Sequence, residues 1–320
     1  TGETAPLVDA PIANLTARLA YNTENGDVVG LGVATDRFFG RDQQLRFGFE
    51  AQRDARRVNL SYNSNSFFDS NPAVGMNVFF GETVANGTYG FASQVGRIEP
   101  RVSYDFGSGL KASAYVSFSK ETIDGVSPTT SFLIQNDEGS QTSRAVGIEL
   151  GYALPVQDDS GLRSMRVSFG AEVGETSRSH SYVEVTARTS ALYVAGGGNI
   201  VLRGAVSAGA INTTGGISNI GDRYMLGQGT IRGFAFGGFG PRDMAVADTP
   251  ALGGNFFGGG RFDVLFPNAL GEQGRNVTPG VFVDVASLWG LDDTAGGVAG
   301  GNIVDDAAYL RASIGLSLRI

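Results

Sequence analysis

The side chains that could do chemistry in this chain of 320 residues are few, because it contains one histidine and no cysteine. A Ser-His-Asp site or a histidine-rich metal site would have to include His180, which stands in the polar run 175–180. Such a run is typical of a surface loop. The absence of cysteine excludes disulfides, thiolate chemistry and most structural zinc sites, and it is compatible with an oxidising compartment. We therefore expect no enzymatic activity.

Acidic pairs and glycine-rich stretches are the remaining candidates for a binding site. The pairs Asp158-Asp159, Asp292-Asp293 and Asp305-Asp306 lack the oxygen-ligand spacing of a calcium loop, and solvated turns explain them. The stretches 227–229 and 237–238 are rich in glycine, but the pattern predicts no helix after either of them. A phosphate site of this kind needs the N-terminus of a helix. The sequence therefore predicts no metal ion and no cofactor.

Composition and charge narrow the class of protein further. The 48 glycines and the 31 aromatic side chains of Phe and Tyr (21 and 10) favour an all-β protein with many turns. The net charge of −8 and the lack of a dense Lys/Arg cluster argue against a nucleic-acid partner. No apolar stretch is long enough for a transmembrane helix, although a barrel strand needs only about 10 residues with alternate apolar side chains.

A two-residue alternation of apolar and polar side chains recurs from residue 12 onward, broken by segments rich in Gly, Asn, Asp or Ser. The first hairpin turn is expected at Glu24-Asn25-Gly26-Asp27, where Asn-Gly supplies the positive φ of a tight turn. The alternation predicts one antiparallel meander of about fourteen strands. The expected strands are 14–22, 29–33, 45–49, 58–62, 74–80, 102–106, 112–118, 146–152, 165–173, 182–194, 199–209, 253–266, 279–289 and 308–320.

Two features favour a transmembrane β-barrel over a soluble sandwich. Short turns such as 106–110 and 158–161 alternate with long insertions at 121–142 and 210–251, as in bacterial barrels. The polar face is made of Gly, Ser, Asn and Arg, and only 18% of the residues are charged. Aromatic side chains stand near strand ends, as the interfaces of a membrane require. These aromatic residues are Tyr21, Phe80, Tyr104, Phe106, Phe118, Tyr152 and Phe266.

Two inward carboxylates are expected on neighbouring strands near the C-terminal end. The alternation places Val281, Val283 and Val285 on the outer face and Phe282 and Asp284 in the lumen. In the preceding strand it places Phe262, Val264 and Phe266 outside and Arg261 and Asp263 inside. Opposed side chains on adjacent strands lie about 5 Å apart. The two carboxylates can therefore hold one guanidinium.

The long insertion contains the motif Ile231-Arg232-Gly233-Phe234, followed by Gly240 and the triplet Pro241-Arg242-Asp243. Together with the strands at 253–266, 279–289 and 308–320, this ordered series resembles the Omp85 superfamily. The resemblance implies that loop 210–251 folds back into the lumen, with Pro241, Arg242 and Asp243 supporting its tip. By resemblance, the lumenal acidic positions of the family fall on Asp263, where a Glu is common, and on Asp284.

Arg232 is the expected partner of these carboxylates, because its planar guanidinium binds them in bidentate fashion and stays charged. The alternative is that Asp263 and Asp284 are solvated lumen residues and that Arg232 is a loop charge. Within the superfamily, the Gly-Pro-Arg-Asp sequence and the Phe282-x-Asp284 stretch that ends at Trp289 look most like the central subunit of the barrel-assembly machinery.

The resemblance implies a protein that folds and inserts β-barrel clients into the cell outer membrane. Its partners would be unfolded outer-membrane proteins, assembly-machinery lipoproteins and outer-membrane lipid. We expect a connector at 1–11 after periplasmic POTRA modules, a barrel at 12–320, and two closing strands after Ile320, which makes about fourteen of sixteen strands. The alternatives are a two-partner secretion or other Omp85-type translocation pore, and a passive porin.

Overall fold

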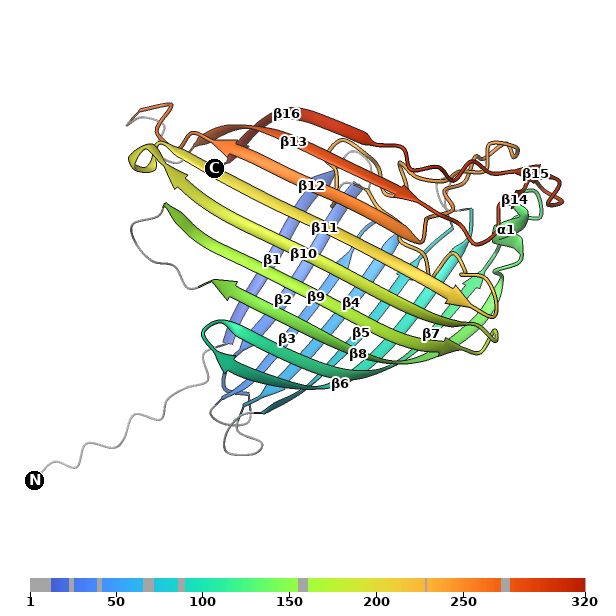
Figure 1. Cartoon of the computed structure of the whole chain (residues 1–320), viewed down its shortest axis with the longest axis horizontal. Coiled ribbons are helices and arrows are strands. Elements are labelled where there is room, and N and C mark those ends of the chain that lie inside the picture. The colour runs from blue at the N-terminus through green and yellow to red at the C-terminus, as the bar shows by residue number, and fades with distance from the viewer. Residues whose placement is uncertain are drawn as a thin grey trace, which may run out of the picture.

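The computed structural model describes residues 13–22, 26–38, 42–65, 72–85, 90–154, 161–227, 229–271 and 277–319. In these ranges the chain forms a β-barrel of tilted strands (Figure 1). The strands are β1 (Ala13–Asn22), β2 (Gly26–Thr35), β3 (Gln43–Ala51), β4 (Ala55–Ser64), β5 (Ala73–Thr83), β6 (Ala92–Gly107), β7 (Leu110–Asp124), β8 (Gly139–Leu154), β9 (Leu162–Thr176), β10 (Ser181–Ala195), β11 (Ile200–Thr214), β12 (Phe256–Leu265), β13 (Thr278–Trp289), β14 (Ala295–Gly296), β15 (Asn302–Ile303) and β16 (Arg311–Arg319).

Fourteen of these strands belong to one antiparallel sheet, in which each pairs with the next along the chain from β1 to β13 and then β16. This confirms the predicted all-β meander. The short strands β14 and β15 form a separate sheet. Because an even number of antiparallel strands returns the chain to its starting side, Ala13 and Arg319 lie at the same end of the barrel. We call this end the terminal rim and the opposite end the loop rim.

The two rims differ in the length of their connections. The loop rim carries the long segments 125–138, 215–255 and 290–310, and the first of these contains the short helix α1 (Phe132–Gln135) (Figure 1). At the terminal rim, two residues join β6 to β7. Gly109 in this turn has φ +88°, and a Cβ there would lie 2.0 Å from the Ala153 carbonyl oxygen. Only glycine fits this turn, which keeps the connection short.

The wall of the barrel is uneven in height. Strands β1 to β5 contain 9 to 11 residues, whereas β6 to β11 contain 15 or 16. About 9–11 residues span a bilayer in a tilted barrel strand. The additional residues of the longer strands therefore provide wall beyond that span, and the loop-rim ends of β7, β8, β10 and β11 contact the long insertion.

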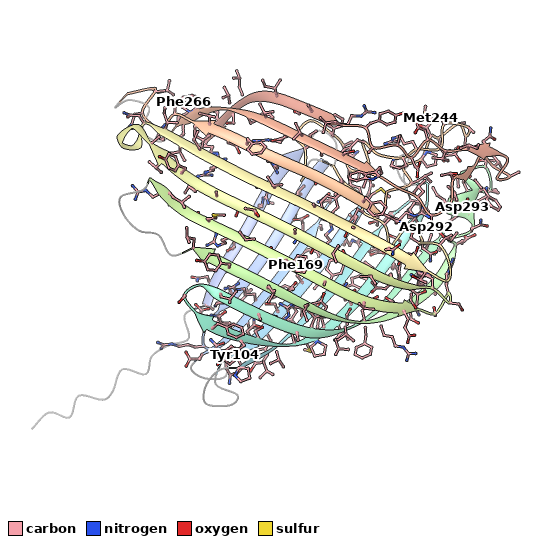
Figure 2. The ribbon with its side chains drawn as sticks, viewed as in Figure 1. Tyr104, Phe169, Met244, Phe266, Asp292 and Asp293 are labelled. Atoms are coloured by element: carbon pink, nitrogen blue, oxygen red, sulfur yellow. The ribbon has the colours of Figure 1, made fainter. Side chains whose placement is uncertain are left out.

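Alternate residues of each strand face opposite sides, and the outer set is apolar. Figure 2 shows Tyr104 and Phe169 among the side chains on the outside of the ribbon. Exposed outer residues include Val116, Phe118, Val146, Ile148, Leu150, Phe262, Val281 and Val283. No helix of the described residues is long and apolar enough to cross a membrane. The outer surface therefore has the character that the alternation predicted.

Several predicted boundaries were wrong by a few residues. Strand β11 continues to Thr214 and β12 begins at Phe256, so the long insertion is 215–255 instead of 210–251. The end of β11 was not predicted, because its last residues, Asn212-Thr213-Thr214, are all polar. Phe266 lies directly after β12, which ends at Leu265. Most of the turns expected at Glu24 to Asp27 and at Asp158 to Gly161, and the segment 1–11, lie outside the described residues.

The buried apolar residues gather where the insertion meets the wall. One cluster at the loop rim contains Phe91, Ile123, Leu133, Ile134, Ile220, Leu252 and Val304. A second cluster contains Ile231 and Phe239 from the insertion and Phe257, Ala286 and Leu288 from β12 and β13. Insertion 215–255 is thus packed against the inner wall over a hydrophobic surface.

The two faces of β4 should respond differently to a new charge. Leu60 faces outward and the neighbouring Asn59 faces the lumen. In a phospholipid bilayer, Leu60→Arg should destabilise the barrel by about 2–4 kcal/mol, because the charge must enter the apolar region, while Asn59→Arg should cost much less. Urea unfolding in vesicles measures both values. Equal losses would contradict the assignment of the faces.

Candidate functional site

Strands β12 and β13 place two carboxylates on the inner wall below the insertion. Their register sets Arg261 opposite Asp284 and Asp263 opposite Phe282. Asp263 and Asp284 are therefore diagonal neighbours on adjacent strands, a register that the sequence had left open. A diagonal pair is farther apart than an opposed pair, which leaves room for a guanidinium between the two acids.

The structure places Arg232 between these acids. Its Nε and Nη2 donate to the two oxygens of Asp284 at 2.7 and 2.6 Å, and its Nη1 donates to Asp263 Oδ1 at 2.7 Å. The backbone N–H of Arg232 also donates to Asp284 Oδ2, at 2.9 Å. Four hydrogen bonds thus join one residue of the insertion to two residues of the strands. We call the group of Arg232, Asp263 and Asp284 the arginine seat.

The arginine seat is strongly coupled electrostatically. The Asp284 side chain has 0% exposure, and that of Asp263 has 11%. Hydrogen bonds to Asp284 and Asp263 raise the pKa of the Arg232 guanidinium above its ordinary value, although burial opposes this. The Phe282 ring lies 3.7 Å below the guanidinium and adds a cation–π contact. Arg232 therefore stays charged at every physiological pH.

The other residues of the loop motif hold the tip against the wall. Ile231 is fully buried in the cluster with Phe257 and Leu288. Gly233 has φ +84°, a conformation that side chains with a Cβ rarely adopt. The Phe234 ring packs edge-on against Phe239 at 5.6 Å. Apolar packing on one side of the tip and ion pairing on the other fix its position.

Residues 241–243 contact the insertion and the neighbouring connection. The Pro241 carbonyl accepts a hydrogen bond from Leu252 N at 3.0 Å. Arg242 donates to the carbonyl oxygens of Thr249, at 2.8 Å, and Gly237. The buried Asp243 accepts a hydrogen bond from Gly297 N at 2.6 Å, and so joins the insertion to segment 290–310.

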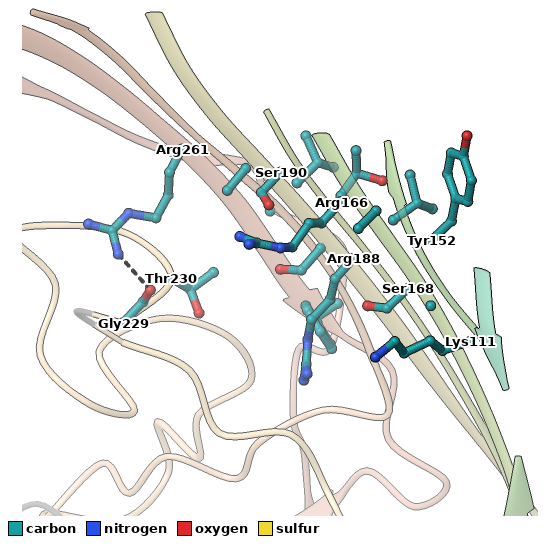
Figure 3. Close-up of a pocket in the computed structure, with 18 of the residues that line it drawn as sticks. Lys111, Tyr152, Arg166, Ser168, Arg188, Ser190, Gly229, Thr230 and Arg261 are labelled. Atoms are coloured by element: carbon teal, nitrogen blue, oxygen red, sulfur yellow. Dashed lines mark hydrogen bonds between the residues drawn. The ribbon is translucent and has the colours of Figure 1, made fainter. Parts of the chain in front are cut away.

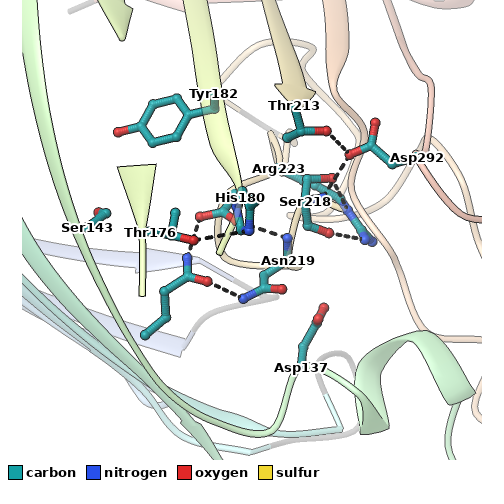
Figure 4. Close-up of polar contacts among 12 residues, drawn as sticks. Asp137, Ser143, Thr176, His180, Tyr182, Thr213, Ser218, Asn219, Arg223 and Asp292 are labelled. Carbon is teal, nitrogen blue, oxygen red and sulfur yellow. Dashed lines mark hydrogen bonds and ion pairs between the residues drawn. The ribbon is translucent and has the colours of Figure 1, made fainter. Parts of the chain in front are cut away.

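Arg223 and Asp292 also fix the insertion, and the sequence did not single them out for this role. Arg223 is buried and donates to the Ser218 hydroxyl at 3.0 Å and to the Leu252 carbonyl at 3.2 Å. Asp292 accepts hydrogen bonds from Thr213 Oγ1 and from Ser218 N, at 2.6 and 2.8 Å (Figure 4). Asp292 is exposed in a bend, as expected of a turn residue, but the sequence did not reveal that it also binds β11 and the insertion.

His180 lies in a buried polar network at the loop rim and is not on the surface as predicted (Figure 4). Its Nε2 lies 3.2 Å from Asp222 Oδ2, and its Nδ1 lies 3.1 Å from the Thr176 hydroxyl. Asp222 belongs to the insertion and also accepts a hydrogen bond from Gln141 at 2.8 Å. The insertion therefore buries His180, which serves as a structural contact. In the described residues, no group of three or more His, Asp or Glu side chains is placed to hold a metal ion.

The fold and the arginine seat together define a class of protein: a β-barrel whose lumen receives an inward-folded loop that is held by ion pairs to the inner wall. The profile of the Omp85 superfamily domain matches residues 37–320. The chain belongs to the Omp85 superfamily. No curated protein sequence matches the chain significantly.

Solved structures with a similar fold come from two kinds of barrel. BamA from Haemophilus ducreyi lacking POTRA domains 1–3 aligns with a TM-score of 0.74 and 17% identity, over 96% of this chain and 64% of that one. CdiB from Acinetobacter baumannii aligns with a TM-score of 0.57 and 12% identity, over 95% of this chain and 53% of that one. The chain thus spans less than two thirds of either structure, and the similarity is one of fold.

The contact between Arg232 and Asp284 should appear as an energetic coupling. Arg232→Ala and Asp284→Ala should each destabilise the barrel, because each removes the closest partner of a charge inside the lumen, and the double variant should lose less than the sum by about 1–3 kcal/mol. Urea unfolding in detergent, monitored through the heat-modifiable mobility of the folded barrel, measures the free energy of unfolding of each variant in the cycle. Arg242→Ala combined with Asp284→Ala is the matched control and should be additive. Additivity in the first cycle would rule out the coupling.

The packing of the insertion should depend on pH through Asp137. This buried carboxylate accepts a hydrogen bond from Ile220 N at 2.7 Å, and burial raises its pKa from 3.8 to about 6. The folded state therefore binds the proton more tightly than the unfolded chain, so this stability is complete below pH 3.8 and is lost as pH rises through about 6.

The measurement is hydrogen exchange of the Ile220 amide between about pH 4 and 8, corrected for intrinsic exchange. In the wild type its protection should fall as pH rises. Asp137→Asn should remove most of this dependence, since an amide does not titrate. An unchanged pH profile in the variant would show that another group is responsible.

Proposed function

We propose that the protein is an outer-membrane assembly factor, which folds and inserts β-barrel client proteins without enzymatic chemistry. The arginine seat carries the proposal. An insertion held by four hydrogen bonds and an apolar cluster occupies the lumen from the loop rim, so the lumen is a poor route for passive solute flow. A passive porin would need this space open.

The edges of the sheet are the surfaces that remain for client strands. Strand β1 has 10 residues and, in the described part of the chain, pairs with β2 on one side only. An edge strand with free backbone groups accepts a further strand by β-augmentation. Within the apolar region of a membrane such an edge is costly, which favours pairing with a client. Unfolded outer-membrane proteins would be the clients, with outer-membrane lipid and assembly lipoproteins as the other partners.

A two-partner secretion transporter is the second candidate, and the fold similarity to CdiB favours it. Such a protein would have to pass one polypeptide through the lumen. That route requires the arginine seat to open, whereas insertion of clients at an edge does not. A permanently closed arginine seat would therefore block secretion through the lumen but would not block the insertion of clients at an edge.

Depletion of the protein from its own cells should separate the two. An assembly factor predicts a several-fold fall in many folded, heat-modifiable outer-membrane barrels. If the wild type and a variant whose insertion is locked by a disulfide both restore these barrels, the result would support entry of client strands at an edge of the sheet. Normal barrel levels with the loss of a single secreted protein would identify a secretion transporter and contradict our proposal. The disulfide can be introduced specifically because the chain contains no cysteine.

A further inference from the structure

A cavity of about 800 Å³ lies in the lumen between the inner wall and the tip of the insertion. Four cationic side chains line it, and no Asp or Glu does: Lys111, Arg166, Arg188 and Arg261. Figure 3 shows Arg166, Arg188 and Lys111 reaching from the strands into the same space, with Thr230 of the insertion facing them. In a chain with a net charge of −8, this concentration of positive charge is unusual.

The register explains how the cavity arises. Two adjacent rows of inward residues cross the sheet here, and small side chains separate the cations. One row reads Lys111, Gly151, Ser168, Arg188 and Ser207. The next row reads Ala153, Arg166, Ser190, Ala205 and Arg261. Because the residues between the cations are so short, the long basic side chains can bend towards a common centre.

Arg166 and Arg188 lack the direct carboxylate contacts that Arg101 and Arg232 have. Arg101 pairs with Glu99 at 2.8 Å, and Arg232 occupies the arginine seat. No carboxylate of the described residues lies within 4.0 Å of either Arg166 or Arg188. Arginine does not lose its charge in proteins. Two neighbouring guanidiniums therefore have no direct ion-pair partner, and the nearest acid on the strand of Arg188, Glu184, interacts with it only at longer range.

The two other cations of the cavity are already partly engaged. Lys111 pairs with Asp105 at 3.1 Å. Arg261 donates to the Gly229 carbonyl at 2.8 Å and lies 3.9 Å from Asp284 (Figure 3). The cations of the cavity without a direct ion pair are thus Arg166 and Arg188. Arg166 and Arg188 are diagonal neighbours on β9 and β10, about 7–8 Å apart at the backbone, so one compact anion can reach both.

We propose that this cavity, which we call the lumenal anion site (Lys111, Arg166, Arg188 and Arg261), binds a phosphate group. A phosphate monoester carries about −1.5 to −2 charges and three strong acceptor oxygens, which matches two unpaired guanidiniums. The hydroxyls of Ser168, Ser190 and Thr230 line the same space and supply neutral donors. The phosphate comes either from a free phosphorylated solute or from the headgroup of a phosphorylated outer-membrane glycolipid.

Calorimetric titration of the full chain in lipid nanodiscs with inorganic pyrophosphate, at constant ionic strength, tests the proposal. The double variant Arg166→Gln/Arg188→Gln should bind on the order of a hundredfold more weakly, about tenfold for each lost guanidinium. Arg18→Gln/Arg46→Gln is the matched control, because it removes two inward cations from β1 and β3 and leaves the site intact. Retention of heat-modifiable mobility shows that each variant is folded.

A second titration distinguishes the two sources of phosphate. If a glycolipid headgroup occupies the site, nanodiscs that contain a bisphosphorylated glycolipid should show weaker pyrophosphate binding than plain phospholipid discs. Equal binding in both discs points to a free solute. With either result, the double variant Arg166→Gln/Arg188→Gln must bind pyrophosphate more weakly than the wild type. The proposal is overturned if the control variant loses as much affinity as the site variant. It is also overturned if a Glu-rich peptide binds this site more tightly than pyrophosphate.

Discussion

The charge of Asp284 is the constraint around which the insertion is organised. This carboxylate is completely buried on the inner wall, and Arg232 supplies three of its hydrogen bonds, two from the side chain and one from the backbone. A buried charge that loses its partner costs about 3–5 kcal/mol, whereas a well-bonded pair is tolerated. Loop and wall therefore depend on each other: without the insertion, Asp284 would lose its three hydrogen bonds from Arg232 and keep only the longer contact with Arg261, at 3.9 Å. This dependence holds the insertion in the lumen more firmly than apolar packing alone would.

The seated insertion divides the interior of the barrel into two regions. A sheet of fourteen strands encloses more space than its own inward side chains can fill. Near the loop rim, the apolar cluster around Ile231 and Leu288 fills that space, supported by Asp243 and Arg223. Towards the terminal rim, short side chains such as Gly151, Ser190 and Ala205 leave a cavity that basic residues line. Both regions follow from which inward positions carry small residues and which carry large ones.

The strand alternation was sufficient to predict the sheet, since β13 and β12 present Val283 and Phe262 outward as expected. The same alternation put Asp263 and Asp284 in the lumen, and the loop motif suggested Arg232 as their partner. The diagonal register could not be read from the sequence, because a strand pattern does not specify the pairing of its neighbours. The burial of His180 and the bonding of Asp292 were missed for a related reason. Their partners Asp222 and Ser218 lie 42 and 74 residues away and become neighbours only when the insertion folds.

Amide hydrogen exchange of residues 229–240 in a bilayer, compared between the wild type and Asp284→Asn, tests the central claim most directly. If the arginine seat holds the insertion, the Arg232 and Ile231 amides should exchange at least about tenfold faster in the variant, while the amides of β6 to β11 remain protected. Equal exchange in the two proteins would show that apolar packing alone holds the insertion, and would contradict the account.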